Sequence, residues 1–428
     1  MVMEELSRRR FISGSALSAG ALWMAAGNQA LGQSANEKLN IGIIGTNNRA
    51  LANIDGVQSQ NITAICDIDD EYIAVAKKRF PNAAVYTDYR KLIEQKGLDA
   101  VVISTPDHNH APATAFALNH NLHVYCEKPL THTVEEARKI AELTKKKKRV
   151  TQMGTQIHAE PNYRRVVELI RSGAIGNVLE VHTRVGKAWS GRELEPYSDG
   201  TPENMHWDEW LGPCAVAPYH PVFHPARWRG YWAYGNGTLG DMGCHHIDLV
   251  FWALDLRHPT RIAASGPAAH PQFAPEGVKV EYDFPARGTQ PPVKVTWYDG
   301  NLAGDAFKKA GAQSWGDGSL FIGDKGMLLA DYGRYKLLPE DKFVGFVPPA
   351  KSIPDSIGHY EEWMQAIRNG GPTTCNFDYA GALTETVLLG TVAYRTGEPI
   401  EWDARKLKTN NERANALLRK EYRKGWKV

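Results

Sequence analysis

The stretch Leu39-Asn40-Ile41-Gly42-Ile43-Ile44-Gly45-Thr46-Asn47-Asn48-Arg49-Ala50 decides the fold of this chain, because an apolar run is followed there by a glycine turn. A short apolar run bounded by turn residues is typical of a parallel strand that is covered on both faces. The turn after such a strand can lead into a helix whose N-terminus binds a pyrophosphate. The stretch therefore predicts the first strand, turn and helix of a nucleotide-binding domain.

The glycine pattern of this turn departs from the dinucleotide fingerprint at its second position. The three glycine positions of the fingerprint hold Gly45, Asn47 and Ala50. Alanine is accepted at the third position, whereas asparagine at the second replaces the glycine that lets the backbone approach the phosphates. Asparagine tolerates a left-handed backbone better than most residues, so the turn can still form. Taken alone, the pattern fits a nucleotide site and a plain buried strand and turn equally well.

An acidic residue at the end of the second predicted strand, residues 61–67, favours the nucleotide site. Asp67 lies 22 positions after Gly45, and an acid about 20 positions on is placed to bind the ribose hydroxyls of NAD. Its charge would repel the extra phosphate of NADP. The alternative is that Asp67 caps the following helix, since Asp69 and Asp70 stand there as well.

The composition is that of an ordinary globular protein with more than one domain. The chain has 428 residues, of which 43% are hydrophobic and 23% charged, and its formal net charge is +2. A chain of this length exceeds one compact core and suggests two domains. The one basic run, 145–149, ends a predicted helix, where cations interact favourably with the helix dipole. Nothing in the composition indicates a nucleic-acid or membrane surface.

The N-terminal segment predicts export. Ser7-Arg8-Arg9-Arg10-Phe11-Ile12 is a twin-arginine sequence, and an uncharged stretch of small residues follows it to Gly32. Cleavage after Gly32 would leave Gln33 as the first residue of a periplasmic or otherwise exported protein, and a membrane anchor is the competing interpretation. Twin-arginine export carries folded proteins already loaded with cofactor, so any cofactor should be tightly held. A second substrate, or a later step of the same reaction, must then restore it.

Alternating strands and helices up to residue 154 predict an α/β fold with a doubly wound parallel sheet. After a helix over 162–172, longer polar strands such as 178–185 and 293–298 and loops rich in Trp, Pro, His and Gly indicate a substrate domain. Cys66 and Cys126 should be buried free thiols, and no cysteine spacing predicts a metal site. The predicted domains are a signal peptide at 1–32, a NAD-binding domain at 33–155 and a substrate-binding and oligomerisation domain at 156–428. The predicted strands of the first domain are 39–45, 61–67, a short one near residue 85, 99–105, 121–127 and 149–153; its helices are 71–80, 111–119 and 134–147, and helices at 357–368 and 379–396 close the chain.

Three further stretches carry residues suited to chemistry. The fourth strand runs into residues 104–110, and the fifth into residues 126–130, where Lys128 lies between an acid and a proline. The carboxyl ends of parallel strands face the ligand crevice, which favours a functional role for these side chains. In the third stretch, 235–248, Asp241 and His245 are four apart and would share one face of a helix. An aspartate can orient an imidazole for proton transfer, although a capped helix with an ordinary histidine pair fits the spacing as well.

In combination, these residues resemble the Gfo/Idh/MocA family, which includes glucose-fructose oxidoreductase, inositol dehydrogenase and NAD-dependent glycosidases of the α-N-acetylgalactosaminidase kind. The resemblance covers almost everything after residue 38 and rests on the Gly45 turn, Asp67 and three motifs. It implies a Rossmann domain followed by an α/β domain whose open, mainly antiparallel sheet often forms the interface of a dimer or tetramer. The motifs are Thr105-Pro106-Asp107-His108-Asn109-His110, Glu127-Lys128-Pro129 and Asp241-x-Gly243-x-His245.

The resemblance also implies roles for individual residues. Lys128 and His245 would hold and deprotonate a substrate hydroxyl, while Asp241 would position the substrate or His245; the choice between His245 and His246 depends on the register of the motif. Apart from the resemblance, the loop at 213–232 is dense in aromatic rings and imidazoles, which makes it the candidate for sugar contact through His220, His224 and Trp228. No metal is expected. The cofactor NAD would be lined by Gly45, Thr46, Asn47, Asn48, Arg49, Asp67, Thr105, Pro106, Asp107, Asn109, His110, Glu127, Lys128 and Gln156.

The expected reaction is hydride transfer from a ring C–H of a sugar or glycoside to C4 of NAD. His245 would take the hydroxyl proton, and Lys128 would stabilise the oxygen as it gains charge. The alternative is an NAD-dependent glycoside hydrolase that works by oxidation, elimination, hydration and reduction, with no net redox change. A non-catalytic sugar-binding protein is a third possibility, and only Asn47 supports it.

Overall fold

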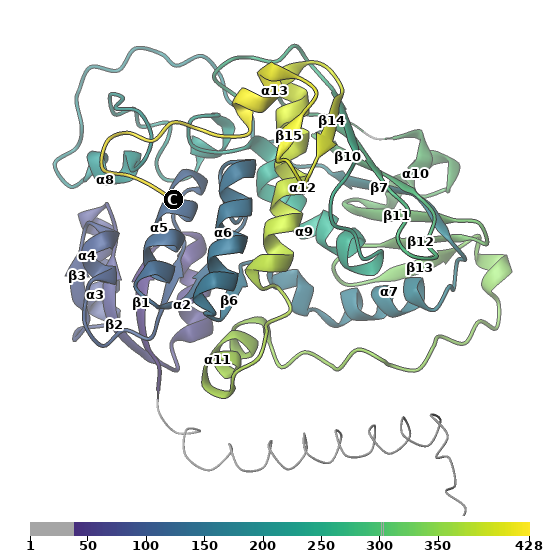
Figure 1. Ribbon diagram of the computed structural model, residues 1–428, viewed down its shortest axis with the longest axis horizontal. Helices are drawn as coiled ribbons and strands as arrows, with labels where there is room; N and C mark the ends of the chain where they lie inside the picture. Colours follow the sequence, from purple (N-terminus) through teal and green to yellow (C-terminus); the bar gives the residue numbers. More distant parts are fainter. Residues whose placement is uncertain (1–37, 301, 303) are drawn as a thin grey trace, which may run out of the picture.

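The computed structural model describes residues 38–428 except 301 and 303, and contains two sheets with helices packed around and between them (Figure 1). The twin-arginine stretch and its cleavage site lie outside the described residues. All five cysteines are buried and free, as predicted for Cys66 and Cys126. Among the residues described, no helix has the length and apolar character needed to cross a membrane.

The first sheet has six parallel strands in the order β3-β2-β1-β4-β5-β6. This order confirms the doubly wound fold, and it reverses direction between β1 and β4. Ligands of such sheets bind outside the carboxyl ends of the strands at this switch point. The strands are β1 (Asn40–Ile44), β2 (Asn61–Cys66), β3 (Ala84–Tyr86), β4 (Ala100–Ile103), β5 (His123–Cys126) and β6 (Thr151–Met153).

Helices cover both faces of the parallel sheet. On one face, α2 (Arg49–Val57) and α3 (Asp70–Arg79) bury apolar residues with α11 (His359–Asn369), which supplies Trp363 and Met364 to this core. The α11 helix therefore packs on the N-terminal sheet although it lies in the C-terminal part of the chain. The other face carries α4 (Tyr89–Ile93), α5 (Asp107–Asn119) and α6 (Val134–Lys147). The predicted capping box of α6, formed by Thr133 and Glu136, is confirmed.

Helix α5 begins four residues earlier than the predicted helix at 111–119, so Asp107 to His110 form its first turn. Pro112 lies inside this helix and cannot donate the hydrogen bond that the carbonyl of His108 would normally accept. The Nζ of Lys420 donates to this carbonyl at 3.1 Å instead. Lys420, near the end of the chain, thus stabilises α5 just before residue 111, where the sequence predicted this helix to begin.

The second sheet has nine strands in the order β13-β12-β11-β7-β10-β9-β8-β14-β15. Only β7 and β10 pair in parallel, and the other neighbours are antiparallel, which confirms the mainly antiparallel sheet. Its strands are β7 (Val178–Val185), β8 (Arg261–Ser265), β9 (Lys279–Phe284), β10 (Val293–Asp299), β11 (Gly318–Gly323), β12 (Met327–Ala330), β13 (Tyr335–Leu338), β14 (Ile400–Asp403) and β15 (Lys408–Thr409).

Two long helices join the sheets. Helices α9 (Gly237–Ala253) and α12 (Phe377–Thr396) pack on each other, α12 contacts α6, and α9 contacts β7 (Figure 1). Residues on α9 can therefore reach the carboxyl ends of the parallel strands. The remaining helices are α7 (Pro161–Arg171), α8 (Trp207–Leu211), α10 (Asp305–Lys309) and α13 (Glu412–Leu417), with 3₁₀ turns η2 (Gln156–Ala159), η3 (Arg227–Gly230), η4 (Gln313–Trp315) and η5 (Glu340–Phe343).

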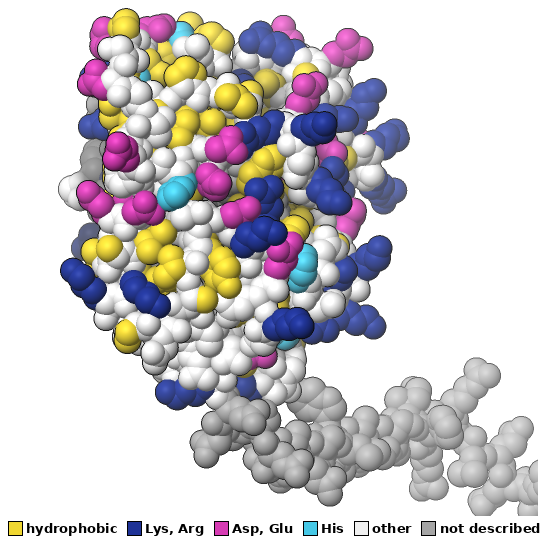
Figure 2. Space-filling view, turned by 90° about the vertical axis from the view of Figure 1, so that its left-hand side faces the viewer, with side chains coloured by type: hydrophobic (Ala, Val, Ile, Leu, Met, Phe, Trp, Pro, Cys, Tyr) yellow, Lys and Arg dark blue, Asp and Glu magenta, His cyan; other side chains and the backbone are white. Residues whose placement is uncertain are grey.

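Charges of both signs mix over the surface of the N-terminal domain. Figure 2 shows the side of the molecule that carries α3 and α4, where acidic and basic side chains lie among each other and basic ones are frequent along one margin. Oppositely charged groups that alternate in this way produce no extended field of one sign.

Candidate active site

A cavity of about 490 Å³ lies at the switch point of the parallel sheet and extends to α9. Its walls come from the β1–α2 turn, the ends of β2, β4 and β5, and from residues 187, 224–229, 241–245 and 332. Every predicted cofactor residue except His110 lines this cavity, as do His224, Trp228, Asp241 and His245. One space therefore combines the predicted nucleotide site and the predicted substrate site.

The β1–α2 turn meets the strand ends closely. Gly45 has a φ of +85°, and a Cβ there would lie 2.7 Å from the backbone oxygen of Ser104, so only glycine fits. The other positive φ in the turn, +55°, belongs to Asn48 and not to Asn47. The Oδ1 of Asn47 instead accepts a hydrogen bond from the backbone N–H of Asn48 at 2.7 Å. The prediction that Asn47 adopts a left-handed backbone in this turn is therefore wrong. Its side chain stabilises the turn through the hydrogen bond to Asn48.

Asp67 holds the same turn from the end of β2. Its Oδ2 accepts hydrogen bonds from the N–H and the hydroxyl of Thr46 at 2.7 and 2.9 Å, while its Oδ1 accepts from the backbone of Ile68 at 2.8 Å. Burial raises the pKa of Asp67, and the hydrogen bonds from Thr46 offset part of this effect. The cap of α3 is Asp69, whose Oδ1 accepts from the N–H of Glu71. Asp67 thus lines the cavity, and Asp69 rather than Asp67 caps α3.

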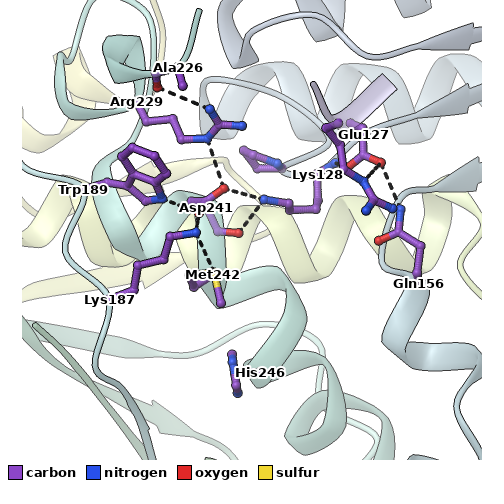
Figure 3. A network of polar contacts seen from close by, with 12 residues as sticks. Glu127, Lys128, Gln156, Lys187, Trp189, Ala226, Arg229, Asp241, Met242 and His246 are labelled. Carbon is purple, nitrogen blue, oxygen red and sulfur yellow. Dashed lines mark hydrogen bonds and ion pairs between the residues drawn. The ribbon is translucent and has the colours of Figure 1, made fainter. Parts of the chain in front are cut away.

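Lys128 is fixed by the carboxylate of Asp241 (Figure 3). Its Nζ donates to Oδ1 of Asp241 at 2.6 Å and to the backbone oxygen of the same residue at 2.7 Å. The other oxygen, Oδ2, accepts from the Nζ of Lys187 at 3.1 Å and from the indole N–H of Trp189 at 2.6 Å. The Nε of Arg229 donates to Oδ1 at 3.2 Å. Three cations therefore surround one carboxylate.

This arrangement keeps Asp241 ionised. Burial alone would raise the pKa of Asp241, but Lys128, Arg229 and Lys187 outweigh burial and hold the pKa well below its usual range. Asp241 is therefore an anion near neutral pH. Its hydrogen bonds orient Lys128 rather than an imidazole, because no hydrogen bond between Asp241 and a histidine is found among the described residues.

His245 lies one helical turn after Asp241 and also faces the cavity. Its Nδ1 is buried and has no hydrogen-bond partner in the described part of the chain. Burial lowers the pKa of His245 well below its usual range, and Lys128 lowers it further, so the ring is neutral. His246 points away from the other labelled residues (Figure 3) and accepts or donates a hydrogen bond at 2.8 Å with the hydroxyl of Tyr332. The structure therefore places His245, and not His246, at the site.

Glu127 connects Arg49, at the start of α2, with Gln156 on the nucleotide side of the cavity. Its Oε1 accepts from Nε of Arg49 at 3.1 Å and from Nε2 of Gln156 at 2.9 Å (Figure 3). A Cβ at Gly154 would lie 2.6 Å from the same oxygen, so glycine is required behind the carboxylate. These contacts hold the start of α2 against the end of β5.

Two predicted residues lie outside the cavity walls. The ring nitrogens of His110 lie near two backbone oxygens, Nε2 at 2.8 Å from that of Thr105 and Nδ1 at 2.7 Å from that of Pro129, and the protonated nitrogen donates to one of them. His220 lines a neighbouring hollow and bonds to the backbone oxygen of Glu195. Sequence reasoning missed several lining residues that carry no motif, and only the aromatic richness of the region pointed to some of them. They are Tyr72, Lys187, Arg229, Met242, Tyr332 and Trp426, with Trp189 behind them.

The residues present fit a dinucleotide. The turn that contains Gly45 leads into α2, whose first turn carries no acidic residue to repel a phosphate. Asp67 stands at the end of β2, where ribose hydroxyls are bound in this fold. The hydroxyl of Thr105, which lines the cavity, is buried without a partner among the described residues, so a ligand donor or acceptor can satisfy it.

Asp107 makes stability depend on pH near neutrality. Burial raises the pKa of Asp107 to about 7, although Arg229 and Lys128 oppose the rise. An unfolded aspartate titrates near pH ~4, so between about pH 4 and 7 the folded protein holds one proton more than the unfolded chain. The contribution of Asp107 to stability is thus fully present at acidic pH and falls by about 1.4 kcal/mol per pH unit in this window.

We expect the substitution Asp107→Asn to remove this part of the pH dependence. Urea unfolding of both proteins at pH 5 and pH 8, at the same nucleotide saturation, measures it. The loss of unfolding free energy between the two pH values should be smaller in the variant by more than 1 kcal/mol. Equal losses would contradict the assignment.

Comparison with known proteins supports the same fold and cofactor. Residues 39–155 match the family model described as "Oxidoreductase family, NAD-binding Rossmann fold", and residues 160–291 match "Oxidoreductase family, C-terminal alpha/beta domain". The inositol 2-dehydrogenase of Salmonella typhimurium is 36% identical over 148 residues, which are 34% of this chain and 43% of that protein. The levoglucosan dehydrogenase of Pseudarthrobacter phenanthrenivorans is 27% identical over 186 residues, 44% of this chain and 40% of that protein.

These sequence matches span less than half the length of each relative. A solved structure, the WlbA dehydrogenase from Bordetella pertussis in complex with NADH and UDP-GlcNAcA, covers 86% of this chain and 99% of its own, with a TM-score of 0.61 and 17% identity. This likeness shows a shared fold. Together the two family models match more than half of the chain, in the two domains that the structure displays. The chain therefore belongs to the Gfo/Idh/MocA family of oxidoreductases and carries the NAD-binding Rossmann domain of that family.

Proposed function

We propose that this protein is an NAD-dependent dehydrogenase that oxidises a ring hydroxyl of a sugar or glycoside. The observation that carries the proposal is the position of Lys128 and His245. A lysine whose Nζ is held by Asp241 and a neutral imidazole line the same cavity as the Gly45 turn and Asp67. A hydroxyl bound between the two side chains would lie beside the nucleotide half of the cavity.

His245 and Lys128 have different roles in removing the proton from this hydroxyl. Neutral His245 can accept the proton, and the ammonium of Lys128 stabilises the negative charge that grows on the oxygen. Asp241 fixes the direction of Lys128 through two contacts and is a positioning residue in this scheme. NAD, when bound, supplies the acceptor for the hydride that leaves the same carbon.

Two features support a carbohydrate as the substrate. The relatives compared above are named for inositol and levoglucosan, and the walls of the cavity include Trp228 and Tyr332, whose rings can stack on the apolar face of a sugar. A second hollow of about 550 Å³ shares His224, Pro225 and Ala226 with the main cavity. The shared wall supports a glycoside, because a second unit of the substrate could lie in this hollow.

We propose export by the twin-arginine route and tight retention of NAD, on the strength of residues 7–12 in the sequence. We also propose a homo-oligomer formed through the open sheet, as the family resemblance implies. Sedimentation analysis of the purified mature protein tests the oligomer, and a single monomeric species would contradict it.

The first experiment denatures the purified mature protein and identifies any released nucleotide by mass. Glycosides and free sugars are then added to intact protein, and the absorbance of reduced nicotinamide is followed. Released NAD and sugar-dependent reduction support the dehydrogenase. A released aglycone without net reduction favours the hydrolase, whereas a protein that stays silent with added NAD would overturn the proposal.

The contribution of Asp67 to nucleotide binding can be separated from its contribution to the turn. Asp67→Ala removes both a ribose acceptor and the hydrogen bonds to Thr46, while Thr46→Val removes only the hydroxyl contact. We expect Asp67→Ala to raise the Kd for NAD at least about tenfold, the loss typical of a hydrogen bond to a charged group. Thr46→Val should change it less than about threefold. Titration calorimetry of nucleotide-free protein measures both, and equal effects would show that Asp67 acts only through the turn.

A further inference from the structure

A second enclosed cavity lies behind the loop that carries Lys128 and shares no lining residue with the main cavity. It has a volume of about 150 Å³ and is bounded by the start of α6, the C-terminal part of α12 and the segment after α13. In Figure 1 these helices lie beside one another, with α13 above α12. Three cationic side chains, Arg395, Arg419 and Lys420, line this cavity, and no carboxylate does.

Two of these cations are neutralised outside the cavity. Lys420 pairs with Glu136 at 3.1 Å and also donates to the backbone oxygen of His108 at 3.1 Å. Arg419 pairs with Glu135 at 3.4 Å. Both carboxylates belong to the first turn of α6 and balance these charges. The charge of the cavity that remains uncompensated is therefore that of Arg395.

Arg395 has no such partner. Among the described residues, no carboxylate lies within ion-pair distance of its guanidinium and none of its N–H groups donates a hydrogen bond, and the side chain is half-buried in the cavity wall. Burial lowers the pKa of Arg395 to about 10, and Arg413 adds repulsion. A half-buried guanidinium without a protein counter-charge is available to an anion that enters the cavity.

The residues around Arg395 leave the N–H donors of its guanidinium unused. Its guanidinium carbon lies 5.2 Å from the ring centre of Trp232, which lines the same cavity. A cation–π contact needs no N–H donor, so the N–H groups of Arg395 stay available to a ligand. The hydroxyls of Thr133 and Thr391 lie in the same walls. This set, one planar cation with hydroxyl donors in a space a few water molecules wide, suits an oxyanion.

We propose that this cavity binds a small oxyanion, the phosphate or carboxylate group of a small molecule or ion, through the guanidinium of Arg395. The site is distinct from the place where the nucleotide phosphates would bind. It adjoins the main site along one helix, because Asn236, which lines this cavity, precedes α9, and α9 carries Asp241 and His245 of the main cavity.

The test is calorimetric titration of the full mature protein, saturated with NAD so that the nucleotide site is closed to added anions. Inorganic phosphate and acetate are titrated in separate arms, which distinguish the two oxyanion classes. We expect saturable binding of at least one of them, and Arg395→Gln should weaken it by about tenfold to a hundredfold, as loss of hydrogen bonds to a charged group does. Arg405→Gln, which removes an exposed arginine outside the cavity, should leave the Kd unchanged.

A second variant guards against a folding defect in Arg395→Gln. Thr391→Leu keeps every charge and fills part of the cavity, so it should abolish binding in a protein with an unchanged melting temperature. Absence of saturable binding in the wild type would overturn the proposal. Equal Kd values in wild type, Arg395→Gln and Thr391→Leu would also overturn it, whatever the protein's reaction proves to be.

Discussion

Lys128→Ala lowers kcat for sugar-dependent NAD reduction by about a hundredfold to a thousandfold, which is the loss expected when a preorganised donor to a developing oxyanion is removed. The side chain of Lys128 is only 10% exposed, and its Nζ donates two hydrogen bonds to Asp241. It is therefore fixed before substrate arrives and needs no rearrangement to receive the negative charge. Stopped-flow absorbance of reduced nicotinamide in a single turnover measures the change.

Lys187→Met is the matched comparison. Lys187 donates to the same carboxylate at 3.1 Å, but its side chain is 43% exposed, so solvent screens its charge and its removal should cost less than about tenfold. Both variants should release NAD on denaturation in the same amount as the wild type. Unchanged turnover in Lys128→Ala, or equal losses in the two lysine variants, would contradict the role proposed for Lys128.

Asp241→Asn lowers the free energy of unfolding by about 3 kcal/mol or more, because it leaves buried cations without their counter-charge. The carboxylate is 7% exposed and contacts Lys128, Lys187 and Arg229 at 2.6, 3.1 and 3.2 Å. An amide of the same shape keeps the packing but cannot balance these charges. Urea unfolding at constant pH measures the loss.

The control for stability is Asp55→Asn, which breaks a contact of 2.6 Å with Arg79 between side chains that are 60% and 34% exposed. This exposed pair should contribute less than about 1 kcal/mol. If Asp241→Asn costs no more than this control, the cluster around Asp241 is not a buried charge network.

Local pattern predicted the parallel sheet well. The strand and turn at 39–50 and the acid after 61–66 lie where periodicity placed them, and the helix at 134–147 has the predicted bounds with its capping box. These features depend on neighbours within a few positions along the chain. A buried strand needs only an apolar run, and a helix start needs only a capping residue and its partner. The family resemblance then added the candidate residues Lys128, Asp241 and His245.

Contacts between distant segments of the chain decided features of the fold and the site that the local sequence pattern could not predict. The helix at 107–119 begins early because Lys420 satisfies the carbonyl that Pro112 leaves free, and α11 covers a face of the N-terminal sheet from the far end of the chain. The partner of Asp241 likewise proved to be Lys128, 113 positions away, rather than a histidine one helical turn along.

The sequence by itself determined the strands of the parallel sheet and the nucleotide turn, because both are encoded by short-range spacing, and the family resemblance supplied the candidate side chains. Only the tertiary structure decided which charges meet. Lys187, Trp189 and Arg229 join Asp241 from separate segments, and His245 rather than His246 faces the cavity. The physical reason is that ion pairs, burial and pKa values depend on distances through space, which arise only when the two sheets pack around α9 and α12.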